Sequence, residues 1–121
     1  MNARILFASL LLAASVPAVA QKAPAPPVDT VNEIAASQLP PEAHDVIARI
    51  RKGGPFTYAK DGVVFGNREK QLPPQKRGYY KEYTVKTPGE RTRGARRIVA
   101  GAGGELYYTD DHYQHFRRIR E

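Results

Sequence analysis

Four side chains in the second half of the sequence could together carry out acid–base chemistry at a phosphate group. Glu82 lies in a run of alternating residues, and Arg93 and Arg97 follow it after a segment rich in turn-forming residues. One carboxylate beside two guanidinium groups leaves a net positive hollow, which suits a phosphate. His112 stands at a turn between two further runs, where a side chain can reach across a cleft. Taken singly, the carboxylate–arginine pair is more often a structural ion pair, and His112 a turn residue.

Taken together, these residue types match the needs of RNA cleavage by transesterification. A base removes the proton from the ribose 2′-hydroxyl as that oxygen attacks phosphorus. An acid protonates the departing 5′-oxygen, and cations stabilise the charge on the non-bridging oxygens. We assign the base to Glu82, the acid to His112 and the cations to Arg93 and Arg97. This chemistry calls for no metal or other cofactor, and DNA should resist it because DNA lacks the 2′-hydroxyl.

Strand alternation is the device that would bring these groups together. Strands are predicted over 78–85 and 95–100, with a turn-rich connection between them that makes them neighbours in a sheet. Every second residue of a strand points to the same face. We therefore expect Glu82 to face Arg97, with Arg93 further along the same side.

The rest of the pattern predicts an α+β domain. A helix is expected over 40–52, where apolar residues recur at helical spacing before Gly53. A short helix is also expected just before it, capped by Asp29 or Thr30 and carrying Val31, Ile34 and Ala35. Short runs separated by turn residues then predict strands over 63–65, 78–85, 95–100, 106–109 and 113–119. Helical segments followed by consecutive short strands favour an N-terminal helix packed on a small antiparallel sheet.

Composition restricts the partners and the chemistry. The 121 residues carry a net charge of +7 and no cysteine. The charge favours a polyanion, which could be nucleic acid, an anionic membrane or an acidic polysaccharide. The lack of cysteine excludes disulfides, thiolate metal sites and a cysteine nucleophile. Two alternatives to an enzyme stay open: a non-catalytic basic RNA-binding module, and a cationic membrane-active protein, which would need a long basic amphipathic helix.

The N-terminal part of the sequence reads as an export signal followed by a tether. Residues 1–20 combine a positive start, a short apolar run and the small-x-small pattern Ala18-Val19-Ala20. An uncleaved membrane anchor is the alternative. Residues 21–29 are rich in proline and alanine, which predicts a flexible segment. The folded domain is expected over 30–121, as a monomer that is secreted or periplasmic and has no membrane contact once the signal is removed.

Several runs of residues occur in an order and spacing that point to a known family. They are LPPEAHDVIARI (39–50), GPFTYAKDG (54–62), DGVVFGNRE (61–69), GYYKEYTV (78–85), TPGERTRGARRIVAG (87–101) and YYTDDHY (107–113). Together they resemble the secreted bacterial guanyl-specific ribonucleases, which are relatives of barnase, and most of all their small streptomycete branch. The resemblance spans about 39–116. It implies the microbial ribonuclease fold and cleavage of single-stranded RNA after guanosine through a 2′,3′-cyclic phosphate.

The resemblance also implies residue roles. It supports Glu82 as base, His112 as acid, and Arg93 and Arg97 as phosphate ligands. It further identifies a guanine-binding site, in which Glu69 accepts hydrogen bonds from guanine N1–H and the exocyclic amine. The other residues implied there are Phe65, which stacks on the base, Asn67 and Arg68, whose backbone N–H groups meet O6, and Tyr113, which lines the site.

Three features depart from the family pattern. Gly66 stands where a larger polar residue is common. The streptomycete enzymes join their ends by a disulfide, and Ala35 occupies roughly one of the two positions here. The C-terminal run 117–120 is unusually basic and could add phosphate contacts. By analogy with the family, a protein inhibitor of the barstar type is a further expected partner besides RNA.

Overall fold

The computed structural model describes residues 31–121 of the chain. The predicted signal peptide (1–20) and the predicted flexible segment (21–29) lie outside the described residues. The elements in chain order are β1 (Asn32–Ala35), the 3-10 turn η1 (Ala36–Gln38), α1 (Pro41–Lys52), β2 (Val63–Val64), β3 (Tyr80–Thr84), β4 (Arg97–Gly101), β5 (Leu106–Thr109) and β6 (Arg117–Arg120). The strands form one sheet in the order β1-β6-β5-β4-β3-β2.

Helix α1 forms as the sequence predicts. Pro41 occupies its first turn, where its missing N–H group costs no hydrogen bond. Gly53 ends the helix in a left-handed conformation (φ 86°), and the N–H groups of Gly53 and Gly54 donate to the carbonyls of Ile50 and Arg49. Ala43 and Ile47 are buried and face the sheet. Within 31–121 no helix is long and apolar enough to cross a membrane.

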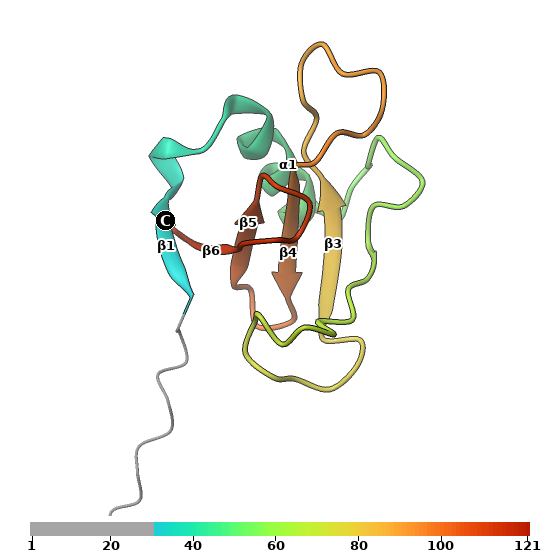
Figure 1. The fold of residues 1–121 in the computed structure, drawn as a ribbon. Coiled ribbons are helices and arrows are strands. Elements are labelled where there is room, and N and C mark those ends of the chain that lie inside the picture. The colour runs from blue at the N-terminus through green and yellow to red at the C-terminus, as the bar shows by residue number, and fades with distance from the viewer. Residues whose placement is uncertain (1–30) are drawn as a thin grey trace, which may run out of the picture.

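The sheet has a different hydrophobic layer on each face. Figure 1 shows β3, β4 and β5 side by side with α1 packed behind them. Ile98 and Tyr108 lie in the core cluster on the α1 side. Val99, the next residue of β4, belongs to a second cluster on the opposite face. That second cluster also contains Tyr80, Tyr107, and, from the connecting loops, Leu72 and Phe116. The face away from α1 is therefore covered by loops, and these loops carry the candidate site.

The prediction of a helix at the start of the domain is wrong. Residues 32–35 form β1, which pairs in parallel with β6 so that Ile34 lies opposite Ile119. Both isoleucines are buried against the α1 side of the sheet. A strand gains backbone hydrogen bonds from the open edge of β6, whereas a helix of one turn has a costly nucleus and few bonds of its own. The sheet is consequently mixed, not purely antiparallel, while the α+β class is confirmed.

The last predicted strand is also shorter than expected. It begins at Arg117 instead of Tyr113, and His115 therefore lies in the loop before β6. His112 and Tyr113 both have positive φ (57° and 73°), which is incompatible with an extended strand. The chain end lies beside β1 (Figure 1), as the parallel ladder requires.

Candidate active site

Glu82 and Arg97 share the face of the sheet that points away from α1, although they are not directly opposite. Val99 lies opposite Glu82, and Arg97 lies opposite Thr84. The expected direct pairing of Glu82 with Arg97 is thus displaced by two residues, which makes them diagonal neighbours. The register between β3 and β4 is set at the base of the 85–96 connection, because the Val85 N–H donates to the Arg96 carbonyl there.

Each of the two predicted phosphate-binding arginines has one buried side-chain nitrogen without a hydrogen-bond partner. Arg93 lies in the connection before β4, and its Nε donates to Thr84 Oγ1 at 3.1 Å. Arg97 is 2% exposed, and its Nη1 donates to the carbonyls of Gly94 and Arg96. Arg93 Nη2 and Arg97 Nε are buried without any partner. Buried charged donors are costly without an acceptor, so both nitrogens are suited to an anion.

Tyr113 connects the candidate catalytic groups. Its hydroxyl donates to Glu82 Oε1 at 2.5 Å, and the Arg97 guanidinium carbon lies 5.8 Å from its ring centroid. Its ring centroid lies 4.8 Å from that of His112 and 5.5 Å from that of Phe65, the latter nearly parallel. Burial and then the Glu82 carboxylate raise the pKa of Tyr113 to about 12, so its hydroxyl stays a donor. The structure thus brings Glu82, His112, Arg97 and Phe65 around one ring.

A hydrogen-bonded turn holds the unusual backbone of His112 and Tyr113. Left-handed conformations are strained for residues other than glycine and persist only when the surroundings stabilise them. Thr109, 1% exposed, accepts from the Tyr113 N–H at 3.2 Å and donates its hydroxyl to Asp111 Oδ1 at 2.9 Å. The His112 N–H donates to the Ala95 carbonyl at 2.9 Å. The geometry of the candidate acid therefore depends on Thr109 and Asp111.

Asp111 is a permanent acceptor beside His112. Its carboxylate accepts from the His115 N–H at 3.0 Å and pairs with His115 Nδ1 at 2.7 Å. Partial burial acts to raise the pKa of Asp111, but the hydrogen bonds from His115 and Thr109 outweigh it and lower the pKa to about 2. Sequence reasoning missed Asp111 and Thr109 as positioning residues. The signal was present, because Thr and Asp just before a turn commonly bond to nearby backbone N–H groups.

The predicted guanine-binding residues line a hollow of about 360 Å³ on the same face. His112 and Tyr113 form one side of it. The other lining residues are Phe65, Gly66, Asn67, Arg68, Glu69, Gln71, Gln114 and Phe116. The candidate acid and the candidate base-recognition loop therefore share one hollow, and Glu69 is exposed on its wall.

The loop around this hollow is built by Asn67. Its backbone is left-handed (φ 51°), and its side-chain amide donates to the Leu72 carbonyl while accepting from the Leu72 N–H. Gln71, which sequence reasoning did not single out, donates from Nε2 to the Tyr113 carbonyl at 3.1 Å. The loop is thereby tied both to the buried Leu72 and to the turn that carries His112.

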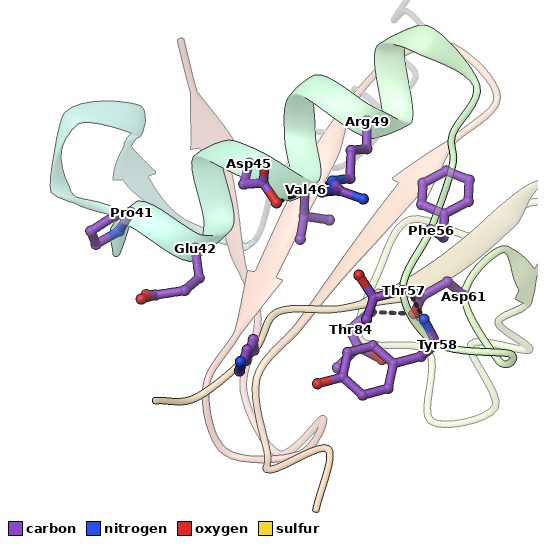
Figure 2. Close-up of a pocket in the computed structure, with 11 residues that line it drawn as sticks. Pro41, Glu42, Asp45, Val46, Arg49, Phe56, Thr57, Tyr58, Asp61 and Thr84 are labelled. Carbon is purple, nitrogen blue, oxygen red and sulfur yellow. Dashed lines mark hydrogen bonds and ion pairs between the residues drawn. The ribbon is translucent and has the colours of Figure 1, made fainter. Parts of the chain in front are cut away.

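A second hollow, of about 320 Å³, lies between α1 and the loop that precedes β2 (Figure 2). Three carboxylates line it, those of Glu42, Asp45 and Asp61, against two cations. This balance is unfavourable for a phosphate. Asp61 instead has a supporting role, because it accepts from the Thr84 N–H at 2.8 Å, as Figure 2 shows. Thr84 is the residue whose hydroxyl orients Arg93.

Neither hollow is lined by a cluster of potential metal ligands in the described part of the chain. Among residues 31–121 there is no cluster of three or more His, Cys, Asp or Glu side chains arranged to hold a metal ion. His44 is exposed on α1, and His115 is occupied by its pair with Asp111. The charged groups on the site face therefore include Arg93, Arg97, Glu82, Glu69 and His112, together with Arg68 on the wall of the hollow.

Comparison with known proteins places this chain in a family. Residues 22–120 match the family model for ribonucleases. The chain is 52% identical to guanyl-specific ribonuclease St of Saccharopolyspora erythraea, over 79% of this chain and 95% of the relative. It is 56% identical to guanyl-specific ribonuclease Sa of Kitasatospora aureofaciens, over 75% and 96% of the two chains. A crystal structure of ribonuclease Sa2 with guanosine-2′-cyclophosphate matches with a TM-score of 0.72 and 47% identity, over 75% of this chain and 97% of that one. The chain therefore belongs to the ribonuclease family, and the resemblance inferred from the sequence motifs is confirmed.

Proposed function

We propose that this protein is a guanyl-specific endoribonuclease. It cuts single-stranded RNA on the 3′ side of guanosine through a 2′,3′-cyclic phosphate and then hydrolyses that product. The observation that carries the proposal is the pair of buried, unpartnered nitrogens on Arg93 and Arg97 beside the Glu82–Tyr113 hydrogen bond. Two relatives that are guanyl-specific ribonucleases, and a similar structure with a guanosine cyclophosphate, support the same reaction.

The chemical roles follow from the positions of the side chains. Glu82 Oε1 accepts a hydrogen bond from Tyr113, and the other carboxylate oxygen, Oε2, takes the 2′-hydroxyl proton. His112, with an exposed ring against Tyr113, protonates the leaving 5′-oxygen. Arg93 and Arg97 hold the non-bridging oxygens, because their unpartnered nitrogens gain an acceptor when the phosphate binds.

Guanine selection rests on the loop that precedes the buried Leu72. The Glu69 carboxylate offers two acceptors to the two adjacent donors of guanine, N1–H and the exocyclic amine. Backbone N–H groups at Asn67 and Arg68 donate to O6, and Phe65 stacks on the base beside Tyr113. Stacking contributes about 1–3 kcal/mol without choosing among bases, so the choice falls to the loop. The edge that is read must be unpaired, which restricts the enzyme to single-stranded RNA.

The protein also acts, in our proposal, as an exported monomer. Support for export comes from the signal-like pattern of residues 1–20. Mass spectrometry of the protein recovered outside the cytoplasm should find an N-terminus at Gln21, and a form that retains residues 1–20 would contradict this. A protein inhibitor of the barstar type would fit the same cationic site by presenting carboxylates to Arg93 and Arg97.

The test of the proposed function uses defined dinucleotides. Purified protein in EDTA should convert GpU to guanosine 2′,3′-cyclic phosphate and cut ApU, CpU and UpU far more slowly. Glu82→Gln and His112→Ala should each lower kcat by roughly 10²–10⁴-fold, with little effect on the Kd of uncleavable dGpdU. Glu90→Gln, the same change at an exposed residue of the 85–96 connection, is the matched control. RNA binding without cleavage would instead identify a non-catalytic binding module.

A further inference from the structure

Two guanidinium groups converge on the open space above Gly66. A β-carbon added to Gly66 would lie 3.7 Å from Arg77 Nη1 and 3.8 Å from Arg68 Nε, with the Arg68 side chain otherwise as near as 3.6 Å. Gly66 and Arg68 belong to the predicted guanine-binding loop, which lines the hollow described above. Arg77 reaches the same point from the far end of the same connection, shortly before β3. The two arginines thus meet at the rim of the site from two parts of the same β2–β3 connection.

The segment that contains these arginines has a surplus of unpaired positive charge. Between 66 and 78 there are four cations and a single acid, Glu69. The cations are Arg68, Lys70, Lys76 and Arg77, and none of them forms an ion pair with a carboxylate among residues 31–121. Elsewhere among residues 31–121, arginines with carboxylate partners include Arg49, Arg51, Arg96, Arg117 and Arg120. Two guanidinium groups that approach each other without a carboxylate repel, and an anion between them would relieve that repulsion.

Both parts of this connection are held in place by the core. Asn67 clamps Leu72, which is 1% exposed, with two hydrogen bonds. The hydroxyl of the buried Tyr80 donates to the Pro73 carbonyl at 2.6 Å. The Tyr79 N–H closes the following turn on the Lys76 carbonyl at 3.1 Å. The positions from which Arg68 and Arg77 extend are therefore fixed before any ligand arrives, which reduces the entropy lost on binding.

We infer that Arg68 and Arg77 form a second phosphate site, which takes the phosphate on the 5′ side of the bound guanosine. This inference rests on the proposed function. The phosphate on the 3′ side is the one that is cut, and it belongs to Arg93, Arg97 and His112. The arginine pair stands instead at Gly66, on the wall formed by the base-binding loop, so we assign to it the other phosphate of the same nucleotide. RNA with a nucleotide before the guanosine then binds more tightly than RNA that begins with guanosine.

The experiment compares three substrates that differ by one phosphate. GpU carries the scissile phosphate alone, pGpU adds one on the 5′ side, and GpUp adds one on the 3′ side. We expect kcat/KM for pGpU to exceed that for GpU by about threefold to tenfold at low salt. Arg77→Gln should bring this ratio close to one while GpU itself is cleaved within about twofold of the wild-type rate. Lys60→Gln, an equal charge change at an exposed residue before β2, should preserve the ratio.

Two further readouts decide the inference. On a longer single-stranded substrate, Arg77→Gln should make the slope of log(kcat/KM) against log salt shallower by about 0.7, the value for one lost phosphate contact. Equal loss on GpU and pGpU, no pGpU advantage in the wild type, or an Arg77 dependence of GpUp in place of pGpU would each overturn the assignment. Comparing the Kd of uncleavable pdGpdU with that of dGpdU tests the second phosphate site separately from the proposed RNA cleavage. An Arg77-dependent difference there would uphold the phosphate site even if no RNA were cut.

Discussion

Replacement of Thr109 by valine tests whether the turn around His112 is what shapes the candidate site. Thr109 is 1% exposed, and valine preserves its shape while it removes the hydroxyl. The change deletes the bond to the Asp111 carboxylate and the acceptor for the Tyr113 N–H. A hydrogen bond to a charged group contributes about 1.5–3 kcal/mol, and an N–H left without an acceptor costs about 1–3 kcal/mol. Because the two effects overlap, we expect Thr109→Val to lower the free energy of unfolding by about 2–4 kcal/mol.

Activity should fall as well, beyond what instability alone produces. His112 and Tyr113 adopt left-handed conformations that the Thr109 hydroxyl helps to hold. When that restraint is lost, the imidazole and the phenol move away from the positions that the proposed reaction requires. Misplacement by about 1 Å can reduce a rate on the order of 10²-fold. We therefore expect kcat on GpU to drop by about 10–100-fold at a temperature where the variant is still folded, with a smaller change in KM.

The assay is urea denaturation alongside steady-state kinetics, with Thr87→Val as the matched control. The hydroxyl of Thr87 is buried but has no hydrogen-bond partner, so its removal should be neutral or slightly stabilising. Equal destabilisation by the two substitutions would show that the hydrogen bonds of Thr109 are not the cause. A Thr109→Val protein that keeps both its unfolding free energy and its kcat would refute the reasoning.

Three other substitutions test separate parts of the site. Tyr113→Phe removes the donor to Glu82 but leaves the ring, so kcat on GpU should fall by roughly tenfold, while near-UV circular dichroism stays that of the folded protein. Glu69→Ala should reduce the preference for GpU over ApU more than it weakens binding of inorganic phosphate, and an unchanged ratio would remove Glu69 from base recognition. Hydrogen bonds lower the pKa of folded Asp111 from 3.8 to about 2, so its carboxylate stabilises the fold above about pH 4, and this contribution is lost as the pH falls toward 2. Asp111→Asn should therefore be less stable than the wild type at pH 6 and nearly as stable at pH 2.5 in urea titrations; a difference that does not depend on pH would contradict this.

Local patterns in the sequence sufficed for the helix and for most strands. The apolar spacing before Gly53 and the turn residues between short runs depend only on neighbours in the chain, so α1 and β2 to β5 could be expected within a few residues. The motif around FGNRE and the position of His112 likewise identified the two walls of the hollow that the structure contains. Alternation placed Glu82 and Arg97 on one face of the sheet, which is also observed.

The sequence by itself thus determined the α+β class, the residues proposed for the site and the shared sheet face of Glu82 and Arg97. Only the tertiary structure decided the parallel pairing of β1 with β6, the two-residue offset between Glu82 and Arg97, and the convergence of Arg68 and Arg77 above Gly66. The first two features depend on strands that are separated in the sequence, and the third depends on how the β2–β3 connection folds back on itself. Strand pairing and register are selected by whichever free edge, loop closure and core contact cooperate in three dimensions, and a local pattern of residues does not contain that information.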